Sequence, residues 1–221
     1  MNVSHNFVSV VVLGNFNPAI VTPDFLNKVC LLNLGVLVEA SPSNVPVFRS
    51  LRFQDLEIFI DLMRLSVTQK PIRDIRSTRV LEVFRSYFDK LPFTPISAVG
   101  VNINCEIRSQ GDANTGNLGK KVRDINRIMG FFGVDALEVS EKILATKRGE
   151  EWKESNFRIE NVKNFIRQIE IKKKDNAVVL NYNYEAGQVE KEPQTVKMLL
   201  ENYEDFCTEF EQFLKLLEVS L

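Results

Sequence analysis

The stretch that decides the fold lies near the middle of the chain, where residues 99–108 read VGVNINCEIR. Apolar side chains alternate there without a break with Gly, Asn, Asn, Glu and Arg, which is the period of a strand buried on one face. We therefore predict a strand whose core-facing residues are Val99, Val101, Ile103, Cys105 and Ile107. The opposite face should carry Asn102, Asn104 and Glu106.

Shorter alternating runs lie on both sides of this strand. Residues 49–53 and 58–67 predict a hairpin or meander before it. After it, residues 157–159, 169–171 and 180–184 repeat the alternation, with a turn expected at 173–176. Both halves of the chain are therefore expected to be rich in strands.

Two internal helices are predicted from apolar residues at helical spacing. The first is capped by Ser77 or Thr78 and ends at Pro92, which cannot continue a helix. The second is shorter, begins near Leu118 and ends around Gly130. The first of these helices should pack on a sheet.

The strongest helical pattern runs from about Thr195 to Leu217 and closes the chain. Its apolar stripe is wide, which favours packing on a sheet over a narrow coiled-coil seam. The remaining positions are mostly acidic: Glu201, Glu204, Asp205, Glu209 and Glu211. We expect the stripe to lie in the core. In the alternative, part of it stays exposed for a partner, with Phe210 and Phe213 as anchors.

Strands that follow one another at hairpin distance favour antiparallel pairing, and a doubly wound nucleotide-binding fold is disfavoured. The predicted class is α+β, with mainly antiparallel sheet packed by amphipathic helices and a long C-terminal helix. We expect a single compact domain over residues 1–221. An open alternative is two similar halves divided near residues 110–117.

Composition is that of an ordinary globular protein. The 221 residues are 44% hydrophobic and 26% charged, with a formal net charge of −1, which excludes a disordered tail. The cysteines Cys30, Cys105 and Cys207 are far apart and odd in number, so no disulfide framework is expected. Neither a signal peptide nor a membrane-spanning segment is recognisable, and the expected location is cytoplasmic.

A glycine-rich loop before the second helix is a candidate phosphate site. Residues 111–121 read GDANTGNLGKK, which lacks the glycine spacing of a Walker loop and the Ser or Thr that follows its lysine. The basic residues Lys120, Lys121, Arg123 and Arg127 are candidates for contact with an anion or nucleic acid. The pI near 6.0 argues against a nucleic-acid-binding protein.

Motifs for catalysis are scarce, since neither a metalloprotease helix nor a nucleophile elbow nor a Cys/His pair is recognisable. We expect no cofactor and no metal, and an enzyme is the less favoured class. Asp55, Glu57 and Asp61 lie close together in sequence and form one candidate polar site. The polar face of the strand at residues 102–108 is another.

Residues 13–18, LGNFNP, end the first strand with a dense group of turn-forming residues around one aromatic side chain. A structural turn is one interpretation of this segment. The other is a recognition loop in which Phe16 is an exposed anchor for a protein partner.

Three parts of the sequence carry a family resemblance: Gly100-Val101-Asn102-Ile103-Asn104-Cys105, Leu180-Asn181-Tyr182-Asn183 and the acidic helix through Phe210. From Val47 onward, their order resembles a sporadically distributed family of uncharacterised bacterial proteins. That family has a strand with the signature Gly-Leu-Arg-Tyr-x-Asn, of which the Arg, Tyr and final Asn are replaced here. The resemblance implies an α+β bacterial protein and carries over no catalytic residue.

Packing signals are abundant in this sequence and chemical motifs are few. The favoured function is a non-catalytic interaction or assembly component of a bacterial multi-protein system, such as one that serves defence. We expect a protein partner or self-association, and no membrane. Two alternatives stay open: an enzyme with a site assembled from distant residues, and a nucleic-acid-associated accessory protein.

Overall fold

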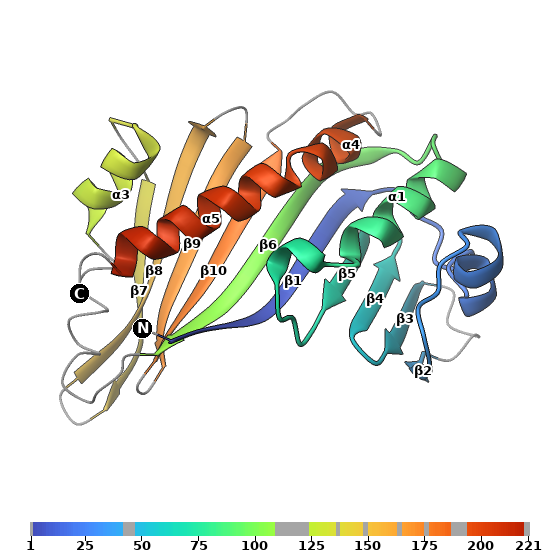
Figure 1. Cartoon of the computed structure of the whole chain (residues 1–221), viewed down its shortest axis with the longest axis horizontal. Coiled ribbons are helices and arrows are strands. Elements are labelled where there is room, and N and C mark those ends of the chain that lie inside the picture. Colours follow the sequence, from blue (N-terminus) through green and yellow to red (C-terminus); the bar gives the residue numbers. More distant parts are fainter. Residues whose placement is uncertain are drawn as a thin grey trace. The chain divides into compact units, whose positions relative to one another are not determined.

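The structure is a computed structural model that describes residues 2–41, 47–108, 124–135, 138–147, 150–162, 165–174, 177–186 and 194–218 (Figure 1). Its strands are β1 (Asn2–Gly14), β2 (Leu37–Ala40), β3 (Phe48–Phe53), β4 (Leu56–Asp61), β5 (Arg64–Gln69), β6 (Ile96–Arg108), β7 (Glu138–Lys147), β8 (Glu150–Val162), β9 (Phe165–Lys174) and β10 (Ala177–Ala186). Its helices are α1 (Val80–Lys90), α3 (Ile125–Phe132), α4 (Gln194–Glu201) and α5 (Tyr203–Glu218), with short turns η1 (Phe25–Val29) and η2 (Ile75–Ser77).

The chain forms two compact units. Unit 1 consists of Met1–Asn6, Ile103–Glu185 and Glu204–Leu221, and unit 2 consists of Phe7–Asn102 and Ala186–Tyr203. The strands β1 and β6 contribute residues to both units. The boundary that the sequence suggests near residues 110–117 lies outside the described residues.

Unit 2 is an antiparallel meander. Neighbouring strands pair in the order β2, β3, β4, β5, and β1 pairs with β5, where Val10 lies opposite Val67. The predicted run at 58–67 is therefore a hairpin, and its turn is fixed by Asp61, whose Oδ1 accepts hydrogen bonds from the backbone N–H groups of Met63 and Arg64. Helix α1 contacts β5 and buries Phe84 against the sheet.

The strands β1 and β6 run antiparallel to each other. Asn15 N donates to Pro95 O over 3.0 Å at the end of β1, and Asn6 Nδ2 donates to Asn104 Oδ1 over 2.7 Å nearer its start. With these pairs, the class is α+β with an antiparallel sheet as the dominant element. This confirms the predicted class.

The central strand prediction is confirmed in β6. Its predicted core residues are all buried: Val99, Val101, Ile103, Cys105 and Ile107. On the other face Asn102 and Glu106 are half-buried, and Asn104 is buried by its bond to Asn6. Burial raises the pKa of the Cys105 thiol to about 12.

Replacing Ile103 by Ala should lower the free energy of unfolding by about 2–5 kcal/mol, because the side chain is fully buried and its loss leaves a cavity. Urea denaturation measures this change. The control is Val38→Ala on the exposed edge strand β2, which should change stability by no more than about 0.5 kcal/mol. Equal effects of the two substitutions would contradict the core position of Ile103.

Unit 1 contains the strands that the sequence predicts in its second half. The strand order is β6, β10, β9, β8, β7, and β8 pairs antiparallel with both β7 and β9. Its buried face carries Phe157, Ile159, Ile169, Ile171, Leu180, Tyr182 and Tyr184. Helices α3 and α5 lie on this face, since Phe132 of α3 and Phe213 of α5 both contact the Tyr182 ring.

The second predicted helix ends later than expected. Gly130 lies inside α3, and the helix ends at Gly133, whose φ of 64° is the left-handed conformation that closes many helices. At its start Asp124 caps the helix by accepting a hydrogen bond from the Arg127 N–H. The predicted start near Leu118 lies outside the described residues.

The closing helix is divided at Asn202 into α4, which belongs to unit 2, and α5, which belongs to unit 1 from Glu204 onward. The Asn202 side chain donates to the Met198 carbonyl oxygen over 2.8 Å, a local bond that competes with regular helix. The predicted apolar stripe is buried along both helices, from Val196 to Leu217. None of the described helices is long and apolar enough to cross a membrane.

A buried ion pair holds α5 on the sheet of unit 1. Arg167 of β9 is 1% exposed, and its guanidinium donates two hydrogen bonds to Glu209 of α5, at 3.0 and 2.8 Å. Tyr182 Oη donates to the same carboxylate over 3.0 Å. Glu209 is one of the acidic residues that the sequence places beside the apolar stripe, and its carboxylate compensates a buried charge.

Replacing Glu209 by Gln should lower the free energy of unfolding by about 3–5 kcal/mol, because it removes the negative charge that pairs with the buried Arg167 guanidinium through two hydrogen bonds. Denaturant titration measures the loss. The double variant Arg167→Met/Glu209→Leu removes both charges and should recover most of the stability. A double variant as unstable as Glu209→Gln would contradict the assigned role of the charge.

Candidate functional site

One candidate site is an exposed apolar end of unit 2, which we call the apolar end and define by Leu13, Leu62, Met63 and Phe93. These residues lie on three segments that backbone hydrogen bonds join. The bonds are Gly14 N to Met63 O at 2.9 Å, Phe16 N to Leu62 O at 3.0 Å and Asn15 N to Pro95 O at 3.0 Å. The loops at this end are therefore held in a fixed arrangement.

Gly14 is required by the close approach of these segments. A Cβ atom at this position would lie 2.2 Å from the Pro95 carbonyl oxygen and 3.3 Å from the Ile96 Cα. Both are backbone atoms, which cannot turn aside as a flexible side chain can. The absence of a side chain at residue 14 thus permits the loop before β6 to contact the end of β1.

Substituting Gly14 by Ala should destabilise the protein by about 1–3 kcal/mol, because the added methyl group overpacks a backbone contact. Urea denaturation measures the effect. Gly35 serves as the control position: it has a positive φ but no atom near its Cβ, so Gly35→Asn, which tolerates that conformation, should be nearly neutral. A neutral Gly14→Ala would contradict the contact.

Phe16 is not the exposed anchor that the sequence suggests. Its ring is only 4% exposed, because the loop turns it inward under the end of β1. Asn17 Oδ1 accepts a hydrogen bond from the Ala19 N–H over 3.0 Å, which closes the turn locally. The structural-turn interpretation of residues 13–18 is therefore the one that holds.

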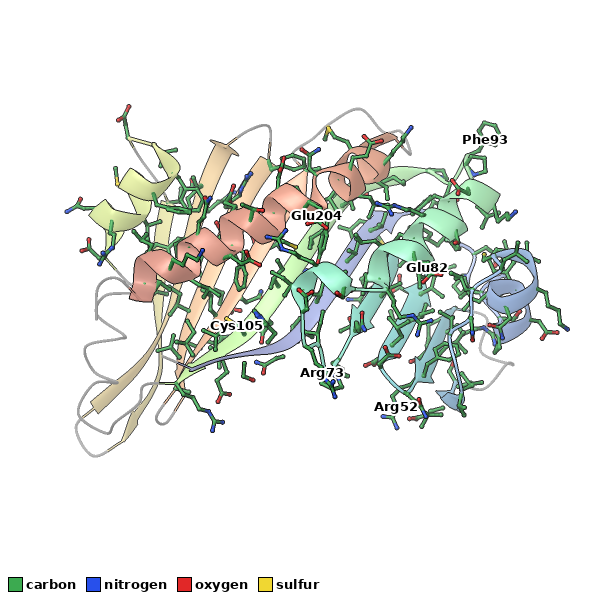
Figure 2. The ribbon with its side chains drawn as sticks, in the orientation of Figure 1. Arg52, Arg73, Glu82, Phe93, Cys105 and Glu204 are labelled. Carbon is green, nitrogen blue, oxygen red and sulfur yellow. The ribbon has the colours of Figure 1, made fainter. Side chains whose placement is uncertain are left out.

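Phe93 has the exposure expected of such an anchor. Its side chain is 94% exposed and stands beyond the end of α1 (Figure 2). The loop is held by Thr94, whose N–H and hydroxyl both donate to the Leu91 carbonyl oxygen. The sequence Pro92-Phe93-Thr94-Pro95 carries a signal for this position, because two closely spaced prolines disfavour a helix interior or a central strand and favour a loop.

A mostly apolar cleft of about 300 Å³ lies beside Phe93. Its walls include Phe16, Ile20, Tyr87, Leu91 and Pro95. Burial raises the pKa of the Tyr87 hydroxyl to about 12, so this wall stays neutral at physiological pH. An apolar side chain from another molecule could enter the cleft while Phe93 enters the other molecule.

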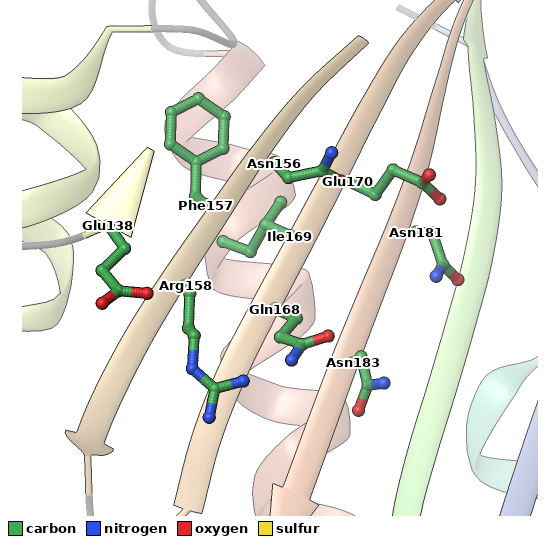
Figure 3. A pocket seen from close by; sticks show the side chains of 9 residues that line it. All are labelled: Glu138, Asn156, Phe157, Arg158, Gln168, Ile169, Glu170, Asn181 and Asn183. Atoms are coloured by element: carbon green, nitrogen blue, oxygen red, sulfur yellow. The ribbon is translucent and has the colours of Figure 1, made fainter. Parts of the chain in front are cut away.

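A second candidate site is a polar hollow of about 710 Å³ in unit 1 (Figure 3). Its lining residues are Glu138, Asn156, Phe157, Arg158, Gln168, Ile169, Glu170, Asn181 and Asn183. Figure 3 views the sheet with α5 behind it, so the polar side chains lie on the face opposite α5. We call this site the polar hollow.

The polar side chains of the hollow form two rows across the strands (Figure 3). In one row the register places Glu138 opposite Arg158, and Arg158 opposite Gln168. In the other row Asn156 lies opposite Glu170. Asn183 and Asn181 of β10 extend the two rows. Side chains so placed are about 5 Å apart between strands, within reach of one small ligand.

Two oxygen atoms of the hollow lack a hydrogen-bond partner among the described residues. They are Oδ1 of Asn181 and Oδ1 of Asn183, and both atoms are buried. Leaving a buried polar group without a partner costs about 1–3 kcal/mol, so such groups call for an explanation.

The other predicted site residues do not come together in the described structure. Lys120, Lys121 and Arg123 lie outside the described residues, and Arg127 is half-buried on α3. Phe210 and Phe213 are completely buried against the sheet of unit 1, so neither ring is available as an exposed anchor. The core interpretation of the terminal stripe is the one that holds.

The acidic cluster at residues 55–61 is divided among separate partners. Asp55 accepts a hydrogen bond from Gln69, Glu57 pairs with Lys70 at 2.6 Å, and Asp61 closes the β4–β5 turn. The described residues contain no group of three or more His, Cys, Asp or Glu side chains arranged to hold a metal ion.

The chain matches no protein-family model, and no curated protein shows significant similarity to it.

Proposed function

We propose that this protein is a non-catalytic binding component of a bacterial multi-protein system, and that it contacts a protein partner through the apolar end of unit 2. The observation that supports this proposal most directly is the 94% exposure of Phe93 beside an apolar cleft. Exposed apolar residues that lie together, rather than singly, are typical of protein interaction sites.

The expected energetic contribution of Phe93 is large. Transfer of a fully exposed Phe side chain into an apolar environment contributes about 1.5–3 kcal/mol. Most residues of a protein interface contribute little, and a few central aromatic residues dominate binding. Met63 and Leu62, both more than half exposed, provide further apolar surface at this end.

The apolar end is also preorganised for binding. Pro92 and Pro95 restrict the backbone on both sides of Phe93, and the Thr94 bonds to Leu91 hold the loop closed. A loop that is already ordered loses less conformational entropy on association, which strengthens binding. We also infer a reducing compartment, since Cys30, Cys105 and Cys207 are buried and form no disulfide bond.

Replacing Phe93 by Ser should weaken the complex with the partner at least about tenfold, which corresponds to the loss of about 1.4 kcal/mol. The urea midpoint should not change, because the ring makes little contact within the chain. Co-purification from the native host, followed by titration of the isolated partner, measures the loss. Val36→Ser, which alters an exposed apolar residue in another loop of unit 2, is the matched control.

A photo-crosslinking residue at position 93 distinguishes a partner from self-association. Benzoylphenylalanine at residue 93 should give one defined crosslinked species, and the same group at residue 36 should not. Mass spectrometry of that species identifies either a different protein or a second copy of this chain. Identical crosslinking from both positions, or a complex unaffected by Phe93→Ser, would contradict the proposal.

A further inference from the structure

The apolar end of unit 2 carries a projecting ring and a recess side by side. Phe93 is 94% exposed, and it also forms one wall of the cleft of about 300 Å³. Other walls are accessible to a second ring, since Ile20 and Leu91 are half-buried and Pro95 is exposed. An apolar cavity of about 150 Å³ is enough to hold a benzene ring. The cleft is therefore large enough to accept the Phe side chain of another molecule.

The last turn of α1, next to this ring, carries charges of both signs. Asp89 and Lys90 are exposed, and neither forms an ion pair with any residue that the structure describes. Lys90 lines the cleft beside Phe93, and Asp89 lines a neighbouring groove together with Pro92. A surface that binds here should therefore offer an anion to Lys90 and a cation to Asp89.

The same surface on another copy of the chain meets both requirements. In a two-fold dimer the same patch lies on both sides of the interface, so that residue i contacts j while j contacts i. A patch fits itself in this way if it holds both a projection and a recess, and charges of both signs. The apolar end holds all of these. A formal net charge of −1 also gives two copies little long-range repulsion.

We propose that the occupant of the apolar end is a second copy of this chain, bound about a two-fold axis. This inference rests on the proposed function, because it names the partner for the same surface. The Phe93 ring of each copy enters the cleft of the other and packs against the ring that forms its wall. Lys90 of each copy faces Asp89 of the other, which fixes the orientation of the pair.

Sedimentation equilibrium of the full chain, over about 1–200 µM, tests the stoichiometry. We expect an equilibrium between monomer and dimer without larger species, because a two-fold interface is closed. Phe93→Ser should weaken the dimer at least about tenfold with an unchanged urea midpoint. Val36→Ser, in another loop of unit 2, should leave the dimer affinity within about twofold.

Exchange of charges tests the two-fold arrangement. Asp89→Lys makes both rim residues basic and Lys90→Glu makes both acidic, so each variant alone should dimerise more weakly than the original chain. An equimolar mixture of the two, with one labelled with ¹⁵N, should form mainly the mixed dimer in native mass spectrometry. Arg73→Glu is the matched control, because it changes the charge as Lys90→Glu does, at an exposed position beyond the opposite end of β5. Its mixture with the original chain should be statistical.

A chain that stays monomeric at about 200 µM would overturn this inference. So would a dimer that Phe93→Ser leaves unchanged, or a statistical mixture of the two charge variants. If the crosslink from residue 93 joins a different protein, the second copy is excluded and the proposed function stands. If residue 93 gives no defined crosslink and Phe93→Ser alters no complex, the proposed function fails together with this inference.

Discussion

Unit 1 depends on the compensation of one buried positive charge. Arg167 is almost completely buried on β9, and Glu209 is the carboxylate that pairs with it, through two hydrogen bonds that fix both the position and the rotation of α5. A shift of α5 along the sheet would break this geometry. Because apolar contacts alone tolerate such shifts, the ion pair gives the helix one position on the sheet, and Tyr182 strengthens it from the neighbouring strand.

Among the described helices of unit 1, α3 and α5 both pack on the Tyr182 face of the sheet. A sheet in which α3 and α5 both pack on one side, through Phe132 and Phe213, has a second face that must be polar to remain in water. Most polar side chains on such a face are solvated or paired. Asn181 and Asn183 differ because their side-chain oxygens are buried and have no hydrogen-bond partner among the described residues. Burial of an acceptor without a donor is what distinguishes this part of the face as a candidate site.

The sequence predicts what depends on local periodicity and misses what depends on distant contacts. The alternation in β6 and the helical stripe ending at Leu217 both match buried faces, because the period alone decides which side chains share a face. Periodicity places Asn181 and Asn183 opposite Tyr182, but it cannot show that a hollow forms around them. It also cannot tell that Glu209 meets Arg167 rather than water, since the two residues are 42 positions apart.

The same limit applies to the aromatic residues of the apolar end. The sequence suggests Phe16 as an exposed anchor, whereas Phe93 is the exposed residue in the structure. Both aromatic residues lie in turns with proline, and turn chemistry alone does not say which ring points inward. Gly14 accounts for the burial of Phe16. Because residue 14 has no side chain, the Pro95 backbone can contact the end of β1 and cover the Phe16 ring. Phe16 thus takes the inner position at this end, while Phe93 stays exposed to water beside the apolar cleft. The burial of Phe16 thus depends on a tertiary contact made by a glycine.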